Sequence, residues 1–93
     1  MTKKEILQDL VNDIAELTNQ ATSKEEAINK GLDRFLHIDY ASVYGGYRLV
    51  SVAVNGGAHH TAFIKQSYER QPYKTFEQML RASLNTLRYV QNK

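Results

Sequence analysis

The pattern of apolar and polar positions changes near residue 40. Before it, between Lys3 and Asn19, apolar residues recur every three or four positions, which is the period of one face of an α-helix. This pattern predicts an amphipathic helix over residues 3–19, and its apolar face consists of Ile6, Leu7, Leu10, Val11, Ile14 and Leu17.

A second helix is predicted to begin after Ser23. Ser23 is followed three residues later by Glu26, and this spacing allows each side chain to accept a hydrogen bond from a backbone N–H at the start of the helix. The helix is expected to end near His37, whose imidazole would cap its C-terminus. With the short link after Asn19, the two helices should form an antiparallel helical hairpin. The expected core face is Ala27, Ile28, Leu32, Phe35 and Leu36.

After Asp39, β-branched and aromatic residues predict three strands, at residues 40–44, 47–54 and 59–65. Gly45 and Gly46 separate the first two strands, and Gly56 and Gly57 separate the last two. Because glycine adopts positive φ without a steric clash, both pairs predict tight hairpin turns. The expected register of the second hairpin places Val54 opposite His59, Val52 opposite Thr61, Ala53 opposite His60, Val50 opposite Phe63 and Arg48 opposite Lys65.

A polar segment at residues 66–74, which contains the single proline Pro72, is predicted to be a loop before a third helix. Thr75 and Gln78 have the spacing of a second capping box. The predicted buried face of this helix is Phe76, Met79, Leu80, Ser83, Leu84, Leu87 and Val90, and the opposite face carries Glu77, Arg81, Asn85 and Arg88. The expected fold is therefore a single α+β domain over residues 1–93, two-layered, of order ααβββα, with helices packed on a three-stranded antiparallel meander.

The composition limits the function classes. The 93 residues contain no cysteine, which excludes disulfides, thiolate metal sites and a cysteine nucleophile. No apolar run has the length of a membrane span and no signal peptide is recognised, so we expect a cytoplasmic protein with no membrane partner. Because so short a chain buries a small core, and because its outer strands have unpaired edges, a homo-oligomer such as a homodimer is expected.

Charge is distributed unevenly along the chain. Residues 1–39 carry five basic and eight acidic residues, whereas residues 40–93 carry seven basic and two acidic residues. The second part also contains all the tyrosines, which are Tyr40, Tyr44, Tyr47, Tyr68, Tyr73 and Tyr89. This shift is typical of two layers of one domain, since no linker separates the two parts.

Few residues suggest catalytic chemistry. His59 and His60 are adjacent, so on a strand they point to opposite faces, and no third metal ligand lies at a suitable spacing. The Gly-Gly pairs lead into strands, whereas phosphate-binding glycine loops lead into helices. No pair of carboxylates and no Ser-His-Asp set is evident. We therefore expect no enzyme, no metal and no cofactor.

Two binding hypotheses remain open. Cations bind phosphates and aromatic rings stack on bases, so one hypothesis is a nucleic-acid-binding module, which would use Arg48, Lys65, Arg70, Lys74, Arg81 and Arg88. The other hypothesis is protein–protein interaction, with the interface candidates Tyr40, Tyr44 and Tyr47. We favour the second because the net charge of residues 40–93 is modest for a nucleic-acid binder.

Two resemblances bear on function. The runs Tyr44-Gly-Gly-Tyr-Arg-Leu-Val, Asn55-Gly-Gly-Ala-His and Phe76-Glu-Gln-Met-Leu resemble small accessory proteins of bacteriophages and mobile elements, over roughly the C-terminal half. That resemblance implies an accessory or regulatory role and names no catalytic residue. The expected order of elements over residues 24–91 is also similar to that of double-stranded-RNA-binding domains. The sequence lacks their Gly-Pro-x-His loop and their Lys-Lys-x-x-Lys cluster.

Overall fold

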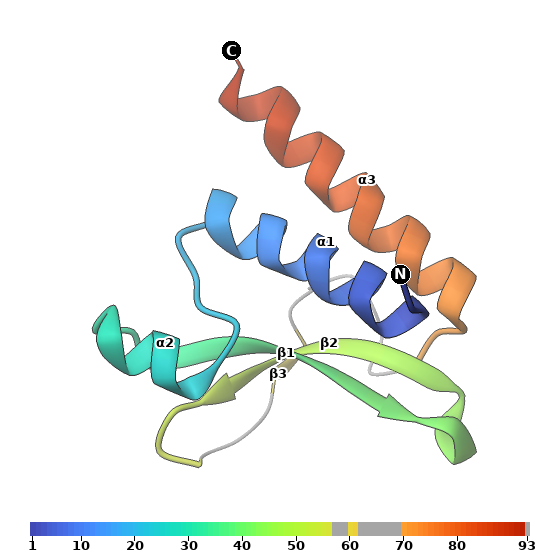
Figure 1. The fold of residues 1–93 in the computed structure, drawn as a ribbon, viewed down its shortest axis with the longest axis horizontal. Helices are drawn as coiled ribbons and strands as arrows, with labels where there is room; N and C mark the ends of the chain where they lie inside the picture. Colours follow the sequence, from blue (N-terminus) through green and yellow to red (C-terminus); the bar gives the residue numbers. More distant parts are fainter. Residues whose placement is uncertain (57–59, 62–69, 93) are drawn as a thin grey trace.

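The computed structural model describes residues 1–56, 60–61 and 70–92. Its elements are α1 (Lys3–Leu17), α2 (Lys24–Asn29), β1 (Arg34–Ala41), the short 3-10 helix η1 (Ser42–Tyr44), β2 (Gly46–Ala53), β3 (His60–Thr61) and α3 (Tyr73–Gln91). The α+β class and the antiparallel sheet predicted from the sequence are confirmed. Helices α1 and α3 lie on the same side of β1 and β2 (Figure 1).

Helix α1 forms where the apolar period predicts it, with its N-terminus capped by a residue that the sequence analysis overlooked. Thr2 accepts a hydrogen bond from the Glu5 backbone N–H at 3.1 Å, and the Glu5 side chain accepts one from the Thr2 backbone at 3.2 Å. The helix ends at Leu17, two residues before Asn19, which takes a left-handed conformation with φ of 54°. Asparagine tolerates this conformation better than most residues, so it stops the helix.

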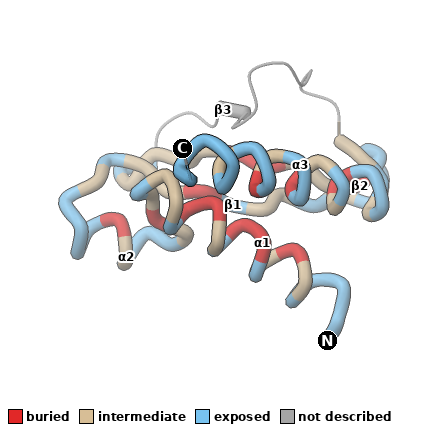
Figure 2. Tube along the Cα trace, turned by 90° about the horizontal axis from the view of Figure 1, so that it is seen from above, coloured by how far each residue is buried: buried red, intermediate tan, exposed pale blue. Residues whose placement is uncertain are grey.

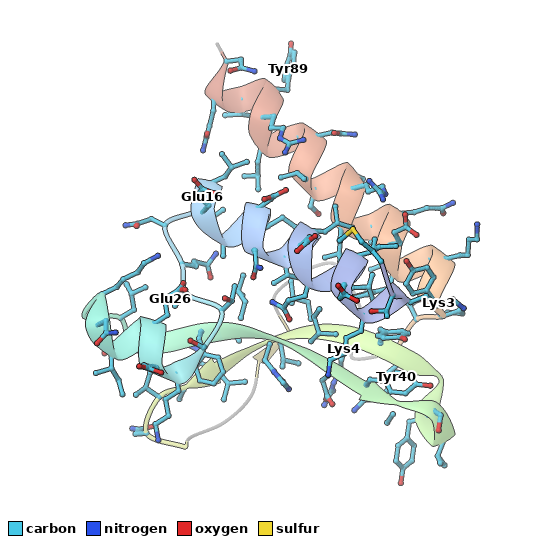
Figure 3. The ribbon with its side chains drawn as sticks, in the orientation of Figure 1. Lys3, Lys4, Glu16, Glu26, Tyr40 and Tyr89 are labelled. Carbon is cyan, nitrogen blue, oxygen red and sulfur yellow. The ribbon has the colours of Figure 1, made fainter. Side chains whose placement is uncertain are left out.

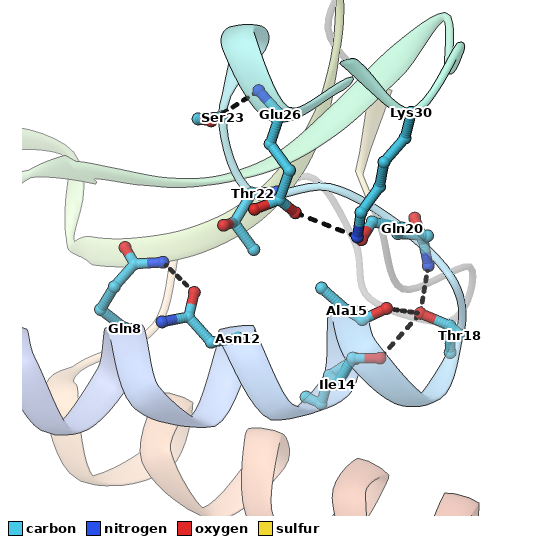
Figure 4. Close-up of polar contacts among 10 residues, drawn as sticks. All are labelled: Gln8, Asn12, Ile14, Ala15, Thr18, Gln20, Thr22, Ser23, Glu26 and Lys30. Atoms are coloured by element: carbon cyan, nitrogen blue, oxygen red, sulfur yellow. Dashed lines mark hydrogen bonds and ion pairs between the residues drawn. The ribbon is translucent and has the colours of Figure 1, made fainter. Parts of the chain in front are cut away.

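The link from α1 to α2 is held by side-chain contacts at both ends (Figure 4). The Thr18 hydroxyl donates to the Ile14 carbonyl at 2.7 Å, and the Gln20 amide donates to that hydroxyl at 2.7 Å. Ser23 caps α2 as predicted, accepting from the Glu26 N–H at 3.1 Å. The link is therefore an ordered segment that lies against the outer side of β1, where the Leu36 N–H donates to the Ala21 carbonyl at 2.8 Å.

The second helix is much shorter than predicted. It ends at Asn29, and the predicted helical residues 34–37 belong to strand β1. The physical reason is Gly31, which has φ of +72° and allows the Leu32 N–H to bond the Ala27 carbonyl at 2.8 Å, a helix-terminating arrangement. The prediction of an antiparallel helical hairpin is consequently wrong. His37, predicted to cap a helix, is an exposed strand residue, and Ile28, predicted to lie in the core, is exposed.

Strands β1 and β2 pair along their whole length, from Arg34 opposite Ala53 to Ala41 opposite Gly46. The predicted strand at residues 40–44 is thus wrong, because β1 begins six residues earlier and Ser42–Tyr44 forms η1. In β3, His60 lies opposite Ser51 and Thr61 opposite Val50. The predicted register, with Val52 opposite Thr61 and Ala53 opposite His60, is wrong by two residues. The rest of the predicted 59–65 strand, with its partners His59, Phe63 and Lys65, lies outside the described residues.

The core fills the space between α1, α3 and one face of the sheet. Its buried members recur along both helices (Figure 2), and they are Leu7, Leu10, Val11, Ile14 and Ala15 of α1, Leu36 and Leu49 of the sheet, and Phe76, Leu80 and Leu84 of α3. The two helices run in the same direction, since Lys3 contacts the Tyr73 ring at one end and the Gln91 amide donates to the Leu17 carbonyl at the other. Val90, predicted to be buried, is exposed near the end of α3.

Helix α3 begins earlier than predicted. Pro72 occupies the N-cap position and Tyr73 is the first helical residue, so Thr75 lies inside the helix and does not cap it. The start is fixed by an antiparallel bridge between Gln71 and Tyr47 of β2. Proline suits a helix start because its φ is already restricted and it has no N–H to leave unpaired.

Candidate interaction site at the end of the β1–β2 hairpin

The connection between β1 and β2 is longer than the predicted two-glycine turn. Ala41 lies opposite Gly46, so residues 42–45 form the loop, with η1 at its start. Gly45 ends η1 in a left-handed conformation with φ of 100°. We call residues 39–48 the hairpin end. It brings together charged, aromatic and exposed apolar residues.

The charged group at the hairpin end is centred on Asp39. Its Oδ2 accepts a hydrogen bond from Arg48 Nε at 2.8 Å and another from Arg70 Nη2 at 2.8 Å. Arg70 Nη1 also donates to the Asp39 backbone carbonyl at 3.0 Å. The exposed fraction of the Arg70 side chain is 13%, against 28% for Arg48. Arg70 therefore ties the segment before α3 to β1, while Arg48 pairs across the hairpin.

These arginines also change the acidity of the carboxyl group. Partial burial acts to raise the pKa of Asp39, but the hydrogen bonds and charges of Arg70 and Arg48 outweigh it. The pKa of Asp39 therefore lies below its ordinary value of 3.8. The carboxylate stays ionised at neutral pH and neutralises part of the charge of the two guanidinium groups.

An aromatic cluster underlies the same end of the sheet. The Tyr47 ring stacks on Phe76 at 5.7 Å between centroids, meets the edge of Tyr73 at 6.1 Å and lies 4.5 Å from the Tyr40 ring. Lys3 Nζ lies 5.2 Å from the centroid of Tyr73, a cation–π distance. Lys3, Lys4 and Tyr40 are seen at this end of the molecule in Figure 3. Tyr47 is thus a packed residue, with Tyr40 covering it from outside.

The hairpin end also exposes apolar side chains. The exposed fraction is 86% for Val43, 76% for Tyr44 and 56% for Tyr40. Of the three predicted interface tyrosines, Tyr40 and Tyr44 are therefore accessible, whereas Tyr47 packs against Tyr40 and the core. Val43 was missed by the sequence analysis, although its place beside Tyr44 in a turn was a signal for exposure.

A pocket of about 550 Å³ lies beside β1 on the face that carries Tyr40. Lys4, Leu7 and Gln8 of α1 line one wall, and residues 37–40 of β1 line the other. Tyr40, which is 56% exposed, also lines this pocket. The pocket provides a recess into which an apolar or aromatic group could fit.

The predicted basic residues that the structure describes fall into two groups. Arg48 and Arg70 meet at Asp39, while Lys74, Arg81 and Arg88 lie on α3. Arg81 Nε is 2.7 Å from Glu77 Oε2, and Arg88 Nη2 is 3.7 Å from Asp13 Oδ2. The hydrogen bond from Arg81 is the main reason that the pKa of Glu77 is lowered. Lys65 lies outside the described residues.

No metal-binding group is found in the described part of the chain, where no three His, Asp or Glu side chains cluster. Neither is there, in these same segments, a helix long and apolar enough to cross a membrane. No family model, no curated protein and no solved structure matches the chain.

Proposed function

We propose that the protein is a small non-catalytic binding or regulatory protein that acts through protein–protein contact and forms a homo-oligomer. The observation that carries the proposal is the hairpin end, where Tyr40, Val43 and Tyr44 are exposed and where the Tyr40 ring packs on Tyr47. Exposed apolar side chains that gather on a rigid support are typical of interaction surfaces. The resemblance of roughly the C-terminal half to phage and mobile-element accessory proteins supports a protein of bacterial or phage type that acts in the cytoplasm.

The ion pairs favour this hypothesis over nucleic-acid binding. Arg48 and Arg70 direct their guanidinium groups at Asp39, and Arg81 directs its group at Glu77. A phosphate would have to compete with these carboxylates, which lowers the gain in binding free energy from each contact.

The proposal also includes the sheet topology. It takes the sheet as a three-stranded meander in the order ααβββα, with β1 at one edge.

The test is the mass of the protein in solution. Light scattering and sedimentation at micromolar concentration should give a dimer or a larger oligomer for the unmodified chain. The double variant Val43→Ser, Tyr44→Ser should weaken self-association by about tenfold or more, since loss of two apolar contacts corresponds to more than 1.4 kcal/mol. Its unfolding midpoint should barely change, because both side chains are exposed.

A matched control is available at the far end of α3. Tyr89 and Val90 have exposed fractions of 63% and 62%, so Tyr89→Ser, Val90→Ser removes a similar exposed pair away from the hairpin end. The control variant should associate as the unmodified chain does. A monomeric mass for the unmodified chain, or equal losses in both double variants, would contradict the proposal.

A further inference from the structure

The outer edge of β1 offers hydrogen-bonding groups that nothing in the described part of the chain uses. In an antiparallel strand, the N–H and C=O groups of alternate residues point toward the same side. The Leu36 N–H points away from β2, because it donates to the Ala21 carbonyl. Ile38 and Tyr40 must therefore also direct their backbone groups away from β2. Within the described residues β2 is the only strand paired with β1.

The part of this edge that is free to pair is short, because other segments of the chain limit it at both ends. The link from α1 to α2 lies against the strand at Leu36, and the chain turns into η1 at Ser42. Between these two points, Ile38 and Tyr40 are the residues whose backbone groups point outward. A long foreign strand would collide with the link, whereas a second edge of the same length would fit.

We propose that this edge pairs with β1 of a second copy of the chain, antiparallel, about a two-fold axis at Asp39. The inference rests on the proposed function and names the surface through which the oligomer forms. In this register Ile38 of each copy lies opposite Tyr40 of the other. All the outward groups of Ile38 and Tyr40 then form hydrogen bonds, and the two sheets become one continuous sheet.

Neighbouring registers fit less well. If Ile38 lay opposite Ile38 of the second copy, then Tyr40 would face Leu36, whose N–H already bonds Ala21. If Tyr40 lay opposite Tyr40, then Ile38 would face Ser42, which belongs to η1. A one-residue shift would place inward-pointing groups at the interface. The register with the two-fold axis at Asp39 is thus the one that satisfies the outward backbone groups of the edge.

The side chains on the helix-covered face agree with this register. Ile38 and Tyr40 lie on the same face as the pocket beside β1, which Lys4, Leu7 and Gln8 close on the side of α1. Tyr40 of the second copy would lie against Ile38, next to this pocket. A ring that is 56% exposed in the single chain would thereby lose contact with water.

The opposite face carries the charges. There the two copies of Asp39 face each other across the axis, which would be unfavourable for two isolated carboxylates. Each Asp39 is held by Arg48 and Arg70 of its own chain at 2.8 Å, so the negative charge of each carboxylate at the axis is compensated within its own copy. His37 of one copy lies opposite Ala41 of the other.

The absence of cysteine from the sequence makes a register-specific experiment direct. In the proposed pairing, positions 37 and 41 of different copies form a non-hydrogen-bonded pair, with Cα atoms about 4.5 Å apart, which is within disulfide range. Within one chain these positions are about 13 Å apart along the strand. A mixture of His37→Cys and Ala41→Cys chains, oxidised with copper–phenanthroline, should give disulfide-linked heterodimers, and each variant alone should give few.

A mixture of Phe35→Cys and Ala41→Cys chains is the matched control, because these positions face each other only in the register shifted by two residues. It should give few linked dimers. Tyr40→Pro and Tyr40→Ala form a second test, since both lose the ring but only proline loses the outward N–H. The proline variant should be monomeric, while the alanine variant should keep weak association.

The outcomes separate the two proposals. Linking between positions 37 and 41, with loss of association in Tyr40→Pro, supports edge pairing. An oligomer that gives no such link and persists in Tyr40→Pro overturns edge pairing and leaves the proposed function standing. Linking of positions 35 and 41 in place of 37 and 41 overturns the register. A monomeric unmodified chain overturns both proposals.

Discussion

Tyr47 and Gln71 exchange two backbone hydrogen bonds across 24 residues of sequence, with N···O distances of 2.8 and 2.7 Å. This bridge fixes the residue before Pro72 against β2, and with it the position at which α3 begins. The approach is close because the neighbouring position is Gly46. A Cβ at Gly46 would clash with the Gln71 carbonyl oxygen.

We expect Gly46→Ala to destabilise the protein by about 2–4 kcal/mol, because alanine would combine a strained positive φ of 122° with a backbone clash. Denaturant unfolding followed by circular dichroism measures the change in the free energy of unfolding. Gly56→Ala is the matched control, since Gly56 has φ of 83° and no atom within 4 Å of a Cβ. An equal decrease in the free energy of unfolding in both variants would show that Gln71 does not approach Gly46 as closely as described.

Gly56 also provides a direct test of the second turn. The positive φ predicted at Gly56 is confirmed, although the register predicted for the hairpin is wrong, and Gly57 lies outside the described residues. Gly56→Val should cost about 1 kcal/mol or more, because β-branched residues fit poorly at positive φ. Gly57→Val is expected to have a similar cost if the predicted turn extends to that residue. Unchanged denaturation midpoints for both variants would place the turn elsewhere.

The part of the fold that could be predicted is the part with local signals. Helix α1 and the buried face of α3 follow from apolar spacing, and α2 starts at the predicted cap Ser23. The end of α2 was missed because Phe35 and Leu36 continue a helical spacing after Gly31. Gly31 itself was the signal for termination, and alternation of Leu36, Ile38 and Tyr40 was the signal for a strand.

The candidate site was harder to predict. The tyrosines and arginines at the hairpin end were recognised as candidates, but Asp39 was not, although it organises the arginines. Asp39 and Arg70 are 31 residues apart, and their contact depends on the bridge between Tyr47 and Gln71. The contact between Asp39 and Arg48 follows from the β1–β2 register, in which the two residues lie opposite each other. The predicted first strand began at residue 40, so it left Asp39 outside the sheet.

Asp39 should make stability depend on pH in the acidic range. Because its folded-state pKa lies below the ordinary value of 3.8, the unfolded chain binds the proton first as the pH falls. Its contribution to stability is therefore complete above that ordinary value and is lost as the pH falls through the folded-state pKa. Asp39→Asn should flatten the decline of the unfolding midpoint between about pH 5 and about pH 2.

The control for this prediction is Asp9→Asn, which removes an exposed carboxylate from α1. This variant should keep the acid-dependent decline of the unmodified chain. If Asp39→Asn declines as steeply as the unmodified chain does, the ion pairs with Arg48 and Arg70 contribute little in solution.

The last prediction separates protein interaction from nucleic-acid binding at α3. Arg81 and Arg88 lie on its outer side, paired with Glu77 and Asp13. The double variant Arg81→Gln, Arg88→Gln keeps helix propensity and length, so stability should change by less than about 1 kcal/mol. Under the proposed function, the variant and the unmodified chain should show equally weak binding to nucleic acid at physiological salt, measured by fluorescence anisotropy.

Salt dependence gives this comparison a second readout. A phosphate contact releases counterions, so each lost contact would reduce the slope of log affinity against log salt by roughly one. If α3 presents only a solvated helix face, the two slopes should agree between low and physiological salt. A large loss of affinity with a reduced slope in the variant would instead favour the nucleic-acid hypothesis, because weak general attraction of a slightly cationic chain does not depend on two particular arginines.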